Sequence, residues 1–159
     1  MRPIAFALIS FGLAALTACS RIDPIGNDLV ALNAAGQTAM AQADVQQAMA
    51  KVQAAATNPE KAAIMRESAA AIGRAQAALQ QTEMKSPEVR DIQTRMVSGF
   101  GKLGAGAKTA ADAFEASTTS DLDKARQQMR DGQVEFITAG QDMVKLAKQR
   151  SVDLNARRS

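Results

Sequence analysis

The chain has 159 residues and a formal net charge of +3, it lacks histidine, tryptophan and tyrosine, and its single cysteine has no partner for a disulfide bond. Without histidine, Ser-His and Cys-His catalysis and histidine-based metal sites are excluded. The small net charge and the lack of aromatic stacking residues argue against a nucleic-acid partner. We therefore expect a protein that is not an enzyme and holds no metal or diffusible cofactor.

The chain begins with a segment that has the layout of an export signal. Arg2 supplies a positive charge, residues 4–16 form an apolar run, and the two small residues after it precede Cys19. A membrane-spanning helix needs ~18 or more apolar residues, which the stretch 3–18 does not reach. We expect residues 1–18 to be a cleaved signal peptide rather than a membrane span.

The order Leu16-Thr17-Ala18-Cys19 resembles the lipobox of bacterial lipoproteins, and the resemblance covers about the first 20 residues. It implies cleavage between Ala18 and Cys19 and a diacylglycerol on the Cys19 sulfur, in many bacteria with a further acyl chain on its amine. Several acyl chains hold a protein firmly in a membrane. An uncleaved anchor and an ordinary secreted protein remain as alternatives.

The residue after the cysteine bears on location. Ser20 stands where many lipoproteins retained in the inner membrane carry aspartate. The resemblance therefore implies a cell-envelope protein that is anchored in the outer membrane and faces the periplasm. The covalent lipid on Cys19 is the only attached group that we expect.

The rest of the chain is long enough for one compact domain and is rich in alanine, which favours helices and disfavours sheets. Turn and capping residues divide it into four helical segments, which begin near residues 25, 59, 87 and 120 and end near residues 56, 84, 117 and 150. Their start signals are Pro59, Ser86 as an N-cap before Pro87, and Ser120 paired with Asp123 in a capping box.

Short connections between long helices favour antiparallel neighbours. We therefore predict an all-α fold, an up-down-up-down antiparallel four-helix bundle over residues 25–150. Residues 19–24 would form a short lipidated tether, and residues 151–159 a basic C-terminal tail.

The apolar periodicity of the first segment is irregular. Its apolar residues lie on one side of a helix early on and rotate to nearly the opposite side later, the two sets being Ile25, Leu29, Leu32 and Met40, and then Val45, Met49 and Val52. Either a bend near residues 42–44 or a helix buried on two sides would explain the change.

The third segment contains a cluster of glycines, Gly99, Gly101, Gly104 and Gly106. The cluster contains a dinucleotide-binding spacing, but that motif works only where a strand turns into a helix, and no strand precedes it here. Each glycine costs a helix ~1 kcal/mol relative to alanine. We favour a close approach of neighbouring helices, or a kink, over a functional loop.

Alternating helices would place basic residues at the end of the bundle near the lipid, namely Arg21, Lys85, Lys145, Lys148, Arg150, Arg157 and Arg158. Asp23, Glu83, Glu88 and Asp153 would offset them in part and leave this end net basic. The basic residues would contact anionic lipid headgroups, where each cation gains roughly 1 kcal/mol. Alternatively, the cations at the end of the last helix only complement its dipole, and the tail is free. The opposite end would be acidic, with Glu60, Asp112, Glu115, Asp121 and Asp123.

Two classes of function fit these features. The first is a non-catalytic structural or interaction module, which as a scaffold, assembly or exclusion factor binds another envelope protein or itself through an exposed stripe such as Val45, Met49 and Val52. The second is a carrier or sensor that binds a small apolar ligand between its helices. An uncovered stripe over a solid core would favour the first class, and an enclosed cavity the second.

Overall fold

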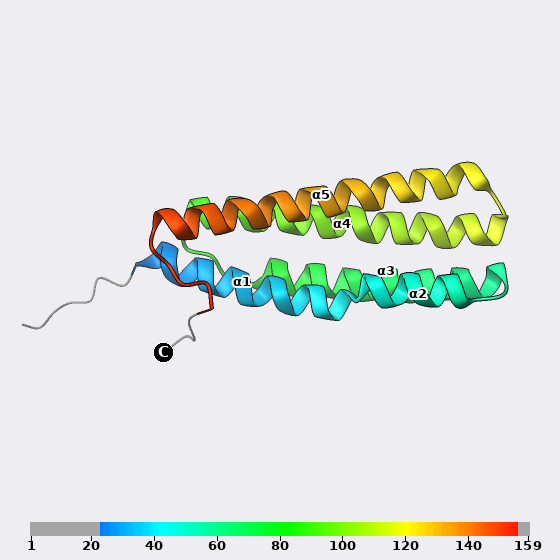
Figure 1. Ribbon diagram of the computed structural model, residues 1–159, viewed down its shortest axis with the longest axis horizontal. Coiled ribbons are helices and arrows are strands. Elements are labelled where there is room, and N and C mark those ends of the chain that lie inside the picture. The colour runs from blue at the N-terminus through cyan, green and yellow to red at the C-terminus, as the bar shows by residue number, and fades with distance from the viewer. Residues whose placement is uncertain (1–22, 156–159) are drawn as a thin grey trace, which may run out of the picture.

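The computed structural model describes residues 23–155. In this part of the chain the structure is all-α, with five helices: α1 (Pro24–Ala43), α2 (Val45–Ala54), α3 (Asn58–Gln81), α4 (Pro87–Ala116) and α5 (Thr119–Gln149) (Figure 1). Ala18, Cys19, Arg21, Arg157 and Arg158 lie outside the described residues. No helix of the described part is both long and apolar enough to cross a membrane.

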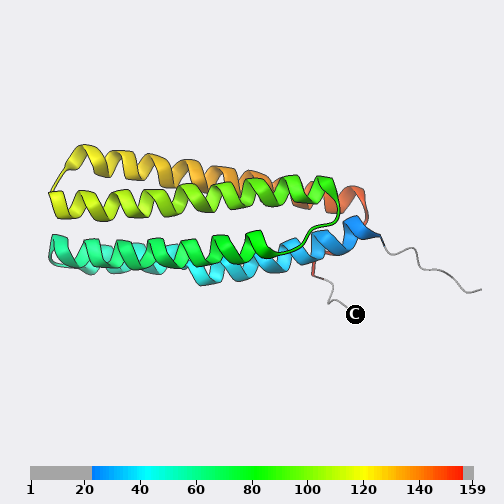
Figure 2. The same cartoon turned by 180° about the vertical axis from the view of Figure 1, so that it is seen from behind.

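The helices form the predicted antiparallel four-helix bundle. The first arm consists of α1 and α2 end to end, α3 returns along both of them, α4 packs on α3, and α5 packs on α4 (Figures 1 and 2). Contacts of α1 with α4 and α5 close the bundle at one end. Among the described elements, α2 packs only against α3.

The irregular first segment contains a bend, so the first of the two explanations is correct. Asp44 has left-handed backbone angles, φ 35° and ψ 50°, and its side chain accepts a hydrogen bond from the Gln47 N–H. This residue ends α1 and caps α2. The bend turns Val45 toward the core and buries Val52, so the predicted exposed stripe on this helix is wrong and only Met49 remains exposed.

Two of the three predicted helix starts are confirmed in position. At α3, Thr57 and Glu60 form a capping box, and Pro59 lies in the first turn. At α4, Ser86 occupies the N-cap position, but its hydroxyl makes no capping bond because it donates to Asp28 instead.

The predicted start of α5 is wrong by about one half turn. The helix begins at Thr119 with Thr118 as its N-cap residue, and Ser120 lies inside the first turn. The Thr118 hydroxyl donates to Asp121, while Asp123 pairs with Arg126 rather than with Ser120. Asp123 is therefore engaged by Arg126 and does not form the predicted capping box with Ser120.

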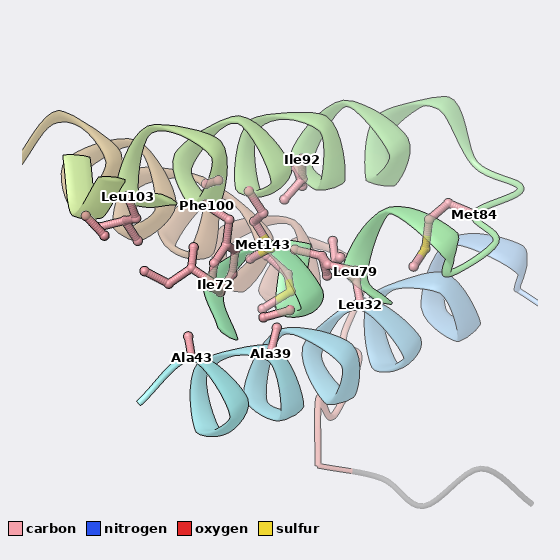
Figure 3. Close-up of a cluster of buried hydrophobic side chains, with 14 of the residues drawn as sticks. Leu32, Ala39, Ala43, Ile72, Leu79, Met84, Ile92, Phe100, Leu103 and Met143 are labelled. Carbon is pink, nitrogen blue, oxygen red and sulfur yellow. The ribbon is translucent and has the colours of Figure 1, made fainter. Parts of the chain in front are cut away.

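The core consists of large side chains set among many buried alanines. The largest fully buried side chains are Phe100, Leu29, Leu32, Ile72, Leu79 and Val89. Figure 3 shows side chains from α1, α3, α4 and α5 meeting in one cluster. Phe136 of α5 packs edge-on against Phe100, with ring centroids 5.0 Å apart.

The glycine cluster produces a close helix contact, as predicted, and α4 runs through it without interruption. A Cβ atom added to Gly99 would lie 2.8 Å from the Gly132 carbonyl oxygen, and one added to Gly132 would lie 2.6 Å from the Gly99 carbonyl oxygen. A Cβ atom added to Gly106 would lie 2.6 Å from the Met129 Cγ atom of α5, whereas Gly104 faces Ile72 of α3. Missing side chains therefore let the α4 and α5 backbones touch.

Candidate functional site

The two ends of the bundle are built from different segments. The start of α1, the turn between α3 and α4, and the end of α5 gather at one end, which we call the tether end (Figure 1). The turns after α2 and after α4 lie at the opposite, distal end. The alternation expected from the sequence is thus confirmed.

The structure brings the described members of the predicted basic set to the tether end or close to it. Lys85 is exposed in the turn between α3 and α4, and Lys145, Lys148 and Arg150 are exposed along the last turns of α5 and just after it. The geometry therefore gathers these cations beside the point where α1 begins.

A buried carboxylate fixes the turn that carries Lys85. Asp28 of α1 is only 6% exposed, and its Oδ2 atom accepts hydrogen bonds from the Lys85 N–H at 2.8 Å, the Ser86 N–H at 2.6 Å and the Ser86 hydroxyl at 2.7 Å. This role of Asp28 was not predicted from the sequence. The available signal was the position of Asp28 between Ile25 and Leu32, on the apolar inner face of the helix. A carboxylate buried there needs hydrogen-bond donors.

Two side chains of α4 complete the support of the same turn. Buried Gln93 donates to the carbonyl oxygens of Leu79 and Thr82, and so caps the end of α3. Arg90 donates to the Met84 carbonyl oxygen. The turn is therefore held by α1 and α4 together, and Lys85 projects from a rigid base.

The segment after α5 folds back onto α1. Ser151 adopts left-handed backbone angles, the Leu154 carbonyl oxygen accepts a hydrogen bond from the Asn33 side chain at 3.0 Å, and Val152 packs beside Gly26. Residues 151–155 therefore belong to the bundle, in contrast to the tail predicted to begin at residue 151.

The acids of the distal end are engaged within the fold. Hydrogen bonds from Thr57 lower the pKa of Glu60, and an ion pair with Arg66 of α3 lowers the pKa of Glu115 on α4. Within residues 23–155 no group of three or more acidic or cysteine side chains is placed to hold a metal ion. Glu60 thus serves a helix cap, and Glu115 a contact between α3 and α4.

Two further ion pairs join α4 to α5 along their length. Arg95 lies 2.7 Å from Asp142, and Lys102 lies 2.7 Å from Glu135. The hydrogen bond from Lys102 lowers the pKa of Glu135, and the one to Asp142 raises the pKa of Arg95. Together with the glycine contact, they make α4 and α5 the most tightly joined pair.

An open groove of about 340 Å³ runs between α1, α4 and α5. Its walls are mainly apolar, and its lining residues are Asn33, Gly36, Gln37, Met40, Met96, Phe136, Gly140 and Met143. Met40, placed on the inner side by its sequence pattern, is half exposed at the edge of this groove because α1 packs only sparsely against α5. It is a surface feature rather than an enclosed chamber.

Beside this groove, the outer face of α5 exposes Val134, Ile137 and Val144. These residues are the most extensive exposed aliphatic row on one helix among the described residues, and the sequence analysis did not single them out. Their spacing of three and seven residues was the signal that could have found them.

Comparisons of the chain with protein-family models, with curated proteins and with solved structures found no match. The class of protein therefore rests on the fold: an all-α antiparallel four-helix bundle with exposed cations and acids at its tether end and an exposed aliphatic face on α5.

Proposed function

We propose that the protein is a lipid-anchored, periplasm-facing bundle of the bacterial outer membrane that acts without catalysis, as a structural or interaction module. The observation that carries the proposal is the short sequence separation between Cys19 and the start of α1. Helix α1 begins at Pro24, and about five extended residues span less than about 20 Å. A lipid on Cys19 would hold the tether end against the bilayer.

The cations of the tether end support this orientation. Exposed Asp23, Glu83, Glu88 and Asp153 lie at the same end, so its excess of positive charge depends on Arg21, Arg157 and Arg158. Exposed Lys85, Lys148 and Arg150 would then face the headgroups, with Lys145 about one turn further away and with Arg21, Arg157 and Arg158 beyond the described residues. Each cation within a Debye length of anionic lipid contributes roughly 1 kcal/mol at most. They would orient a protein that its acyl chains already retain.

The proposed interaction role is supported by how the apolar residues are distributed. The interior is filled by side chains, while an aliphatic face on α5 stays uncovered. Such a face is typical of proteins that bind other proteins. The partner would be another envelope protein or a second copy of the chain.

The alternative is a carrier that holds a small apolar ligand. Only the groove between α1, α4 and α5 favours it, since Met40, Met96 and Met143 could adapt to different ligand shapes. An apolar fluorescent probe that brightens with the wild type but not with a Gly140→Leu variant would support this alternative. Equal fluorescence with both proteins would reject it.

Intact-mass measurement of the protein from its own membranes tests the anchor. We expect residues 19–159 plus a diacylglyceryl group, with or without a further acyl chain. A Cys19→Ser variant should keep its leader and lose the added mass. A free thiol at Cys19 in the wild-type protein, or a leader still attached, would refute the proposal.

Binding of unlipidated protein to anionic vesicles tests the basic end. We expect binding that added salt reverses and that falls several-fold when Lys85, Lys148 and Arg150 are replaced by alanine. Replacing Lys51, Lys108 and Lys124 away from the tether end is the matched control. Binding that ignores salt, or that both triple variants reduce equally, would contradict the proposed orientation.

A further inference from the structure

The outer face of α5 carries a regular row of side chains that no other described element covers. Val134, Ile137 and Val144 are 58%, 48% and 41% exposed. Together with exposed Gln141 they follow one another at intervals of three and four residues, which is the spacing of the a and d positions in a coiled coil. We call these four residues the outer seam.

The bundle does not need the outer seam for its own packing. Gly132, Ala139 and Ala147 are buried on the opposite side of α5, where the helix meets the rest of the bundle. Both the inner and the outer face of α5 therefore carry apolar residues, although a helix at the surface of a bundle normally has a polar outer face. This second face requires a separate explanation.

We propose that the outer seam binds a second copy of this chain, with the two α5 helices side by side, parallel and related by a two-fold axis. An isologous contact of this kind needs one self-complementary patch, which is the commonest arrangement in soluble oligomers. The inference rests on the proposed interaction role and names its partner, while the pairing itself does not require the lipid anchor.

Gln141 decides the direction of the pairing. In a parallel pair it faces Gln141 of the second copy, and the two amides can donate to and accept from each other. In an antiparallel pair, Val134 would lie opposite Val144 of the second copy, and Gln141 would lie opposite Ile137 of the second copy. The two Gln141 amides would then be buried against aliphatic side chains without hydrogen-bond partners. Such burial is costly, and a single polar a position sets the register of coiled coils.

Charges beside the seam fit the parallel arrangement. Arg126 and Asp131 are both exposed and lie five residues apart, which is the spacing of g and e positions that face each other in parallel coiled coils. The two-fold axis would produce two such attractions, each between Arg126 of one copy and Asp131 of the other. The Arg126 guanidinium binds Asp123 at 2.7 Å in the isolated chain and has further N–H groups for a second carboxylate.

The seam is bounded at both ends by like charges. Arg130 and Lys148 occupy the next positions of the same spacing, and in a parallel pair each would face its own copy. The apolar part of the contact is therefore confined to residues 134–144, and the pairs between Arg126 and Asp131 lie just before it in the chain. Such a short seam predicts weak pairing in dilute solution and stronger pairing where the copies are concentrated on one membrane.

Disulfide crosslinking of the full chain in its own membranes tests the pairing. A Val134→Cys variant should yield a crosslinked dimer under mild oxidation. The wild type, which contains only Cys19, and a Gln53→Cys variant on exposed α2 are the controls and should give at least tenfold less. Equal crosslinking of Gln53→Cys and Val134→Cys, or of neither, would overturn the proposal.

Mixing two differently tagged chains tests the direction. A Val134→Cys chain and a Val144→Cys chain should each crosslink with its own kind and not with the other. Crosslinks formed only between residue 134 of one chain and residue 144 of the other would require an antiparallel pair, and would overturn the parallel arrangement.

Four variants test the contacts without altering the core. Ile137→Asp should abolish the residue 134 crosslink, while Met49→Asp, an equivalent change on exposed α2, should not reduce it. Asp131→Arg should reduce crosslinking several-fold, and the charge exchange Arg126→Asp with Asp131→Arg should restore it. Circular dichroism checks that each variant is as helical as the wild type. Undiminished crosslinking in a helical Ile137→Asp variant would refute the seam.

Discussion

Asp28 shows how one side chain can fix a turn far away in the sequence. It lies in the first helix, yet a single carboxylate oxygen accepts three hydrogen bonds from Lys85 and Ser86. A buried carboxylate without these donors would be strongly unfavourable. The pairing therefore ties the entry of the bundle to the turn that bears Lys85.

Replacing Asp28 by alanine should reduce the free energy of unfolding by about 2–4 kcal/mol, because two backbone N–H groups and a hydroxyl lose a charged acceptor. Urea denaturation measures the change. Asn27→Ala, at the exposed neighbouring position, is the control and should shift the free energy by less than about 0.5 kcal/mol. A loss below 1 kcal/mol for Asp28→Ala would contradict the role assigned to it.

Gly132 and Gly73 should respond to alanine in opposite directions. An alanine at 132 would press its Cβ onto the Gly99 carbonyl oxygen and separate α4 from α5, so we expect a loss of about 1–3 kcal/mol. Nothing lies within 4 Å of a Cβ at Gly73 in α3, so the same change there should add up to about 1 kcal/mol from helix propensity. Denaturation of both variants checks the signs. Stabilisation by Gly132→Ala would rule out the close contact.

At the scale of the elements, the bend between α1 and α2 decides which faces are buried. Asp44 has a positive φ, which residues with side chains rarely adopt and which aspartate and asparagine tolerate best. Its carboxylate also caps α2. One residue thus ends a helix, starts the next and returns Val52 to the core.

Asp44→Ala should therefore destabilise the protein by about 1–3 kcal/mol, since it loses the cap and strains the left-handed backbone. Asp44→Asn keeps both properties and should change stability by less than about 0.5 kcal/mol. Thermal denaturation of the two variants measures the difference. An alanine variant as stable as the asparagine variant would show that neither property matters here.

Across the whole molecule, local signals predicted the fold well. Pro59 and Pro87 mark the starts of α3 and α4 in sequence and in structure, and short turns imposed antiparallel neighbours. The bend at Asp44 was one of two explanations for an irregular pattern. The pairing of Asp123 with Arg126 rather than with Ser120 at the start of α5 was not visible from residue types alone.

Long-range contacts were the part that the sequence did not reveal. The role of Asp28 depends on backbone groups far along the chain, and Gly132 contacts Gly99 only once α4 and α5 are side by side. Met40 follows the pattern of a buried residue, but α1 packs only sparsely against α5. Cys19 and its proposed lipid lie outside the described residues and stay a prediction.

The ion pairs and hydrogen bonds of three glutamates make the stability of the whole bundle depend on pH in the acid range. The pKa values of Glu60, Glu115 and Glu135 are lowered from 4.5 by hydrogen bonds in the folded state, so the folded chain binds fewer protons than the unfolded chain at acid pH. Their stabilisation is complete above the unfolded pKa and is lost as the pH falls through the folded values.

Urea denaturation between pH 7 and pH 3 should show stability falling below a pH of about 4.5. A Glu135→Gln variant should start lower and fall less steeply, and Lys102→Met, which removes its partner, should flatten the fall in a similar way. An unchanged slope in both variants would contradict the assigned ion pair.

The limited contacts of α2 have a consequence for local opening. Its ten residues pack only against α3, and Asp44 separates them from the hydrogen-bond ladder of α1. Detaching α2 therefore exposes little apolar surface and leaves the other helices intact. We expect the backbone amides of Val45–Ala54 to exchange with deuterium long before those of α4, so that the distal end frays while the tether end stays closed.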